Sequence, residues 1–62
     1  PHPDAGLPSV KTIFALKARV CPSEADPVAA ATFIARSQGW IDRPFVLERI
    51  ADVLSHHKSL KL

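Results

Sequence analysis

The chain has 62 residues, which is enough for one domain at most. It is 47% hydrophobic and 23% charged, as in ordinary folded domains, and no run approaches the ~20 apolar residues that span a membrane. The formal net charge of +2 permits a nucleic-acid partner, but the chain lacks the Lys and Arg density of a strong polyanion binder.

The small size predicts that the fold needs additional stabilisation. Domains of this length are marginal alone and are often stabilised by disulfides, a metal or oligomerisation. Cys21 is the only cysteine, so a disulfide within the chain is excluded. His56 lies one helical turn after Asp52, but His2 is far away in sequence, and a metal site needs three or four convergent ligands. We therefore expect no metal and no other cofactor, and a homodimer is the remaining expectation.

The first nine residues hold three of the six prolines and one glycine. Proline fixes the backbone and removes a hydrogen-bond donor, so residues 1–9 are predicted to be an extended tail and residues 10–62 a single small domain. The tail lacks the basic start and apolar run of a signal peptide, and a single unpaired cysteine is typical of a reducing compartment. We expect a cytoplasmic protein without a membrane partner.

Residues 10–20 can be interpreted in two ways. With a period of two, one face carries Val10, Thr12, Phe14, Leu16, Ala18 and Val20, and the other carries Lys11, Ile13, Ala15, Lys17 and Arg19. With a period of 3.6, an apolar stripe forms, but Lys17 falls within it. The alternation and the β-branched content favour a short strand, and a helix is the alternative.

Two helices are predicted after this segment. Pro22 ends the first element, Ser23 is the expected N-cap of a helix that runs through VAAATFIARSQ, and Gly39 is its expected C-terminal cap. Asp42 is the expected N-cap of the next helix, with Pro44 early in it.

The second of these helices is expected to bury one face. The residues predicted on that inner face are Phe45, Val46, Ile50, Val53 and Leu54. Trp40 and Ile41, in the turn between the helices, are expected to cover the seam between them.

The order of the elements resembles the ribbon-helix-helix family of bacterial repressors and antitoxins. The segments that carry the resemblance are ALKARV, PSEADPVAAATFIARSQ and GWIDRPFVLERIADVL, within residues 15–56. The resemblance implies a mainly α fold in which an N-terminal strand pairs across a homodimer and two helices follow. It also implies a function, which is binding of duplex DNA in the regulation of transcription.

The resemblance implies a set of site residues. Ala15, Lys17 and Arg19 would face the major groove from the strand, and Arg43 would hold a phosphate at the start of the second helix. Lys11 would add a further phosphate contact. The residues expected at the dimer interface are Phe14, Leu16, Val20, Trp40 and Ile41.

Two other interpretations stay open. In a helix-turn-helix protein the second helix would read DNA, but this one opens with the apolar run PFVL. In a small helical interaction module, residues 10–20 would form a third helix and an apolar surface would dock on a larger protein. Because the chain shows no acid, base and nucleophile at a plausible spacing, and no histidine is close to Cys21, we do not expect an enzyme.

Overall fold

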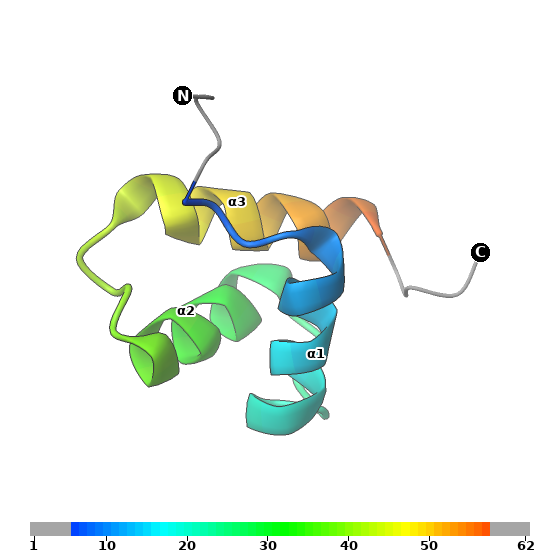
Figure 1. Cartoon of the computed structure of the whole chain (residues 1–62). Helices are drawn as coiled ribbons and strands as arrows, with labels where there is room; N and C mark the ends of the chain where they lie inside the picture. The colour runs from blue at the N-terminus through cyan, green and yellow to red at the C-terminus, as the bar shows by residue number, and fades with distance from the viewer. Residues whose placement is uncertain (1–5, 58–62) are drawn as a thin grey trace.

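Three helices make up the fold in this computed structural model, which describes residues 6–57 and contains no strand within that range (Figure 1). They are α1 (Val10–Val20), α2 (Pro27–Gln38) and α3 (Pro44–His56). The largest helix contact is between α2 and α3, and α1 packs against both. The prediction of a mainly α fold is confirmed, and the three-helix alternative fits the structure. No helix within the described range has the length and apolar character that crossing a bilayer requires.

The strand prediction for Val10–Val20 is wrong, because these residues form α1. Ser9 caps the helix by accepting a hydrogen bond from the backbone N–H of Thr12 at 3.2 Å. Lys17, which interrupts the helical stripe in the sequence, is half-buried, and its Nζ donates to the carbonyl of Pro22 at 3.2 Å. A lysine can lie beside an apolar stripe when its charged end reaches a polar partner. This contact removes the argument against a helix.

Helix α2 begins later than predicted and ends as predicted. Asp26, and not Ser23, is its N-cap and accepts from the N–H of Ala29 at 2.9 Å. Pro27 occupies the first helical position, where its missing N–H leaves no bond unmade. Gly39 adopts the left-handed conformation with φ 76°, which confirms the predicted cap.

Helix α3 also differs from the prediction at its start. Arg43, and not Asp42, is the N-cap residue, and its side chain makes no capping hydrogen bond. Of the five residues predicted on the inner face, the prediction for Phe45 is wrong, since this residue is 78% exposed. Leu54 is partly buried against the core, and the fully buried residues of this helix are Val46, Ile50 and Val53.

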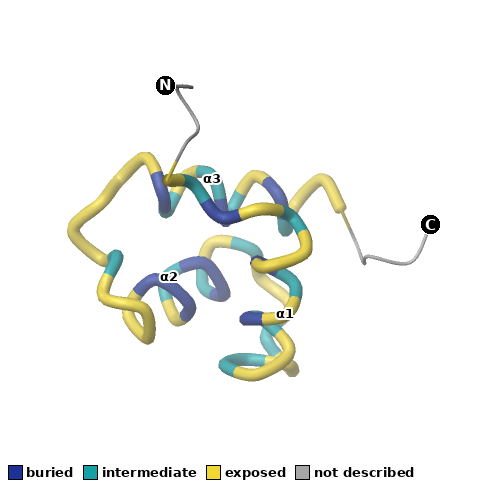
Figure 2. The backbone as a smooth tube through the Cα atoms, viewed as in Figure 1, coloured by how far each residue is buried: buried dark blue, intermediate teal, exposed yellow. Residues whose placement is uncertain are grey.

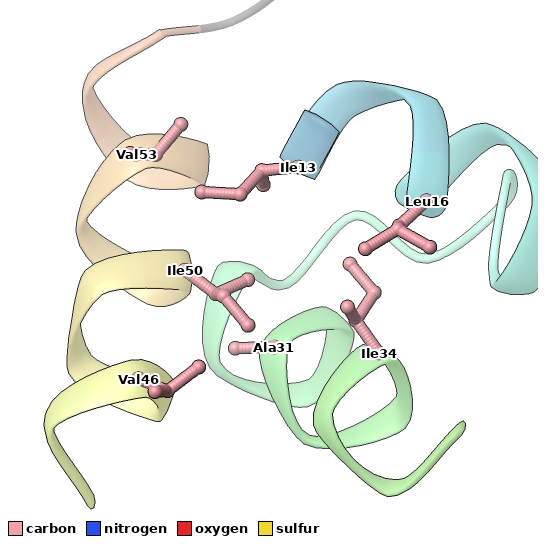
Figure 3. Packing of buried hydrophobic residues seen from close by; sticks show 7 residues of the cluster. All are labelled: Ile13, Leu16, Ala31, Ile34, Val46, Ile50 and Val53. Atoms are coloured by element: carbon pink, nitrogen blue, oxygen red, sulfur yellow. The ribbon is translucent and has the colours of Figure 1, made fainter. Parts of the chain in front are cut away.

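The core is formed by one side of each helix (Figure 2). Its buried residues are Ile13, Leu16, Ala31, Ile34, Val46, Ile50 and Val53. Figure 3 shows Ile13 of α1 pointing toward Val53 of α3, and Ile50 pointing toward Ala31 of α2. No polar or charged side chain of residues 6–57 is buried, so apolar packing alone holds the helices together.

The residues before α1 lie against the helices. Leu7 packs on the core and Pro8 is buried. The Nε of Arg49 on α3 donates to the carbonyl of Pro8 at 3.1 Å, which ties this segment to the last helix. Residues 1–5 of the expected tail are outside the described range.

Candidate functional site

A groove of about 340 Å³ runs between the N-terminal segment and α3. Its lining residues are Leu7, Phe45, Glu48, Arg49 and Asp52. Ligand sites in proteins span roughly 300–1,000 Å³, so this groove is at the small end of the range. It has room for protruding side chains of a partner and is small for a large cofactor.

Phe45 lies in the groove because of its position on α3. Successive helical residues are turned by about 100°, so Phe45 is displaced by that angle from the buried Val46. Glu48 and Asp52 follow Phe45 at three and seven positions, which places all three on the same side of the helix. An aromatic ring that is 78% exposed therefore stands among acidic side chains, and not in the core.

The two carboxylates give the groove its charge. Glu48 and Asp52 are exposed and one helical turn apart, and no lysine or arginine of residues 6–57 forms a salt bridge with either of them. The Oδ1 atom of Asp52 lies 3.1 Å from Nδ1 of His56, and the two form an ion pair only when the histidine is protonated. Both partners of this pair are well exposed, and surface pairs of this kind contribute little to stability.

Arg49 holds the two sides of the groove in place. It is half-buried, and its hydrogen bond to Pro8 fixes the guanidinium against the N-terminal segment. Leu7, which precedes Pro8, lines the groove together with Phe45. The lining of the groove therefore consists of two apolar side chains, two carboxylates and one guanidinium. The two negative charges and the one positive charge sum to one net negative charge.

The structure brings together only part of the set of residues predicted to bind DNA, since Lys11, Ala15 and Arg19 share one face of α1. Lys11, Ala15 and Arg19 are exposed on α1, but Lys17 lies on another side of the helix and is bonded to Pro22. Arg43 precedes α3 and is exposed, on a different element from the others. The outward strand face that was expected to group these residues does not exist.

The residues predicted at the dimer interface mostly belong to the core of a single chain. Leu16 is buried, and Phe14, Val20 and Trp40 pack against the core. Ile41 is 45% exposed and is the one of the five that remains on the surface. The side chains expected to hold two copies together are therefore largely used within one chain.

Cys21 shows no activation as a nucleophile. Burial raises the pKa of its thiol above the ordinary value, Lys17 opposes this shift and Glu24 adds to it. Its Sγ lies 3.8 Å from the carbonyl oxygen of Ala30. A reactive thiol needs a lowered pKa, so the environment of Cys21 is that of a packing residue.

The described residues also hold no group of three or more His, Cys, Asp or Glu side chains placed to bind a metal ion. His56 meets Asp52 at the end of α3, as their spacing in the sequence indicates. His2 is outside the described residues.

The sequence contained part of the signal for the groove. The spacing of Phe45, Glu48 and Asp52 could have been recognised once Val46, Ile50 and Val53 were taken as the centre of the buried face. The side of the groove formed by the N-terminal segment had no such signal, because Leu7 belongs to a proline-rich segment whose position depends on a bond to Arg49.

Comparison of the chain with family models, curated proteins and solved structures found no match.

Proposed function

We propose that this chain is a small helical interaction module that docks on a larger protein through the groove between its N-terminal segment and α3. The observation that carries the proposal is Phe45, which is 78% exposed on the wall of a preformed groove. Aromatic side chains are enriched at protein interfaces because they bury a large area with few rotatable bonds.

A second candidate function is the binding of duplex DNA. It is supported by α1, which carries Lys11, Lys17 and Arg19 and no acidic residue. The exposed side of α3 opposes it, since Glu48 and Asp52 would repel phosphates if that helix entered a groove of DNA. The strand that would have entered the major groove is absent from the described residues, and the same finding removes the reason for a shared dimer sheet.

A titration separates the two candidates. The fluorescence anisotropy of a labelled random DNA duplex is measured during titration with the chain at about 50 and 200 mM salt. Two concentrations are used because binding through phosphate contacts weakens strongly as salt rises. We expect no binding that depends on salt. A loss of affinity of roughly tenfold or more between the two conditions would restore the DNA-binding hypothesis.

The docking proposal predicts that Phe45→Ser weakens binding strongly and leaves the fold intact. Random twelve-residue peptides displayed on phage are selected on the immobilised chain, and the dissociation constants of the selected peptides are then measured for both forms. Truncating a central aromatic residue at an interface typically costs about 2 kcal/mol or more, so we expect binding to weaken at least about thirtyfold. Because the ring is largely exposed, the thermal midpoint should shift little.

Phe33→Ser is the matched control, because Phe33 is also partly exposed, at 44%, but lies on α2 outside the groove. It removes the same ring and should leave peptide binding unchanged. Peptides that bind both variants as well as they bind the original chain would contradict the proposed function.

A further inference from the structure

We propose that the groove recognises an arginine side chain of its partner, flanked by an apolar residue; this inference rests on the proposed function. The charge of the groove indicates a cation. Glu48 and Asp52 are both exposed at its edge, and neither forms a salt bridge with a lysine or arginine of residues 6–57. The single guanidinium among the lining residues, that of Arg49, donates through Nε to the carbonyl of Pro8, so the lining keeps an excess of one carboxylate.

The apolar walls indicate what the rest of the side chain must be. Leu7 and Phe45 both line the groove, so an occupant needs an apolar body as well as a charged end. Arginine has a long aliphatic stem, its planar guanidinium stacks on aromatic rings, and it pairs with carboxylates through two parallel hydrogen bonds. Glu48 is three residues from Phe45 on the same side of α3, so stacking on the ring and pairing with the carboxylate are compatible.

The flanking apolar residue follows from the lining of the groove. Two apolar side chains, Leu7 and Phe45, line the groove, so a neighbouring aliphatic side chain of the partner adds apolar contact beside the guanidinium. A peptide segment with arginine next to a leucine or a similar residue therefore matches the lining in both charge and polarity.

The test uses the peptides selected from the random library on the full 62-residue chain. Selected peptides should be enriched in arginine beside an apolar residue, and replacing that arginine by glutamine should weaken binding. Glu48→Gln should weaken binding of the same peptides about tenfold, because it removes a charged hydrogen-bond acceptor at the contact. Asp42→Asn is the matched control: it removes one negative charge from the exposed turn before α3, outside the groove, and should leave binding nearly unchanged.

Each outcome decides one of the two proposals. Peptides that depend on Phe45 but show no preference for arginine, or that bind Glu48→Gln as well as the original chain, overturn the inference and leave the docking function standing. If Glu48→Gln and Asp42→Asn weaken peptide binding equally, only the net charge of the chain matters for binding, and the inference of an arginine site is overturned. If no selected peptide depends on Phe45, both proposals fail. Sedimentation that shows self-association of the chain, lost in Glu48→Gln, would identify the occupant as a second copy and overturn the inference.

Discussion

Replacing Ile50 by alanine is expected to remove most of the stability of the protein at room temperature. Ile50 is fully buried on α3 and faces Ala31 on α2 (Figure 3). Truncating a buried isoleucine to alanine lowers the free energy of unfolding by about 2–5 kcal/mol. The core of a domain of this size rarely supplies more than about 3–5 kcal/mol in total, so this single cavity removes most of the stability.

Urea titrations followed by circular dichroism measure the effect. Ile41→Ala is the matched control, because it deletes the same atoms from a side chain that is 45% exposed, and it should lower the free energy of unfolding by less than about 1 kcal/mol. Where Ile50→Ala is too unfolded for a reliable baseline, Ile50→Val provides the graded form, with an expected loss of about 0.5–1.5 kcal/mol. Equal losses in the Ile41 and Ile50 variants would contradict the packing described for α3.

Ala31→Leu is expected to produce the second large effect, by overpacking instead of a cavity. Ala31 is 1% exposed and lies in the core where α2 approaches α3. A side chain inserted into a well-packed core costs about 1–3 kcal/mol, since neighbouring side chains must leave their preferred rotamers or the helices must separate. The thermal midpoint should fall, and the near-ultraviolet dichroism of Trp40, which packs against this core, should change.

The control for this prediction is Ala18→Leu on the exposed side of α1. Alanine and leucine have similar helix propensities, so this variant isolates the effect of burial from that of helix formation. Its free energy of unfolding should remain close to that of the original chain. A stable Ala31→Leu variant with unchanged dichroism would indicate that the space between α2 and α3 is larger than the structure has it.

Much of the helical content could be predicted from local signals. Gly39 ends α2 as expected, and the prolines at 27 and 44 each occupy the first position of a helix. The strand error at Val10–Val20 has a specific cause. A lysine in an apolar stripe opposes a helix when the side chain is taken alone, and Lys17 is accommodated by a bond to Pro22, beyond the end of the helix. That contact exists only once the turn after α1 is formed.

The candidate groove was less accessible from the sequence for two different physical reasons. The apolar side chain of Phe45 predicts a place on the inner face of the helix, whereas its angular position on α3 belongs with Glu48 and Asp52. Leu7 falls in the predicted tail because of the prolines around it, and nothing nearby in sequence indicates a partner for its side chain. Local periodicity can indicate the angular position of Phe45 on its helix. It cannot indicate the position of Leu7, which depends on the contact between Pro8 and Arg49.

The bond between Arg49 and Pro8 also has a consequence for the order of folding. Its partners are 41 positions apart, whereas α2 and α3 are neighbours in the chain and form the largest contact. Closing a long loop costs more entropy than closing a short one, so the α2–α3 pair is expected to form early and the N-terminal segment to attach late. The groove then exists only after the last step, and a ligand that binds both its walls would hold the first and last parts of the folded chain together.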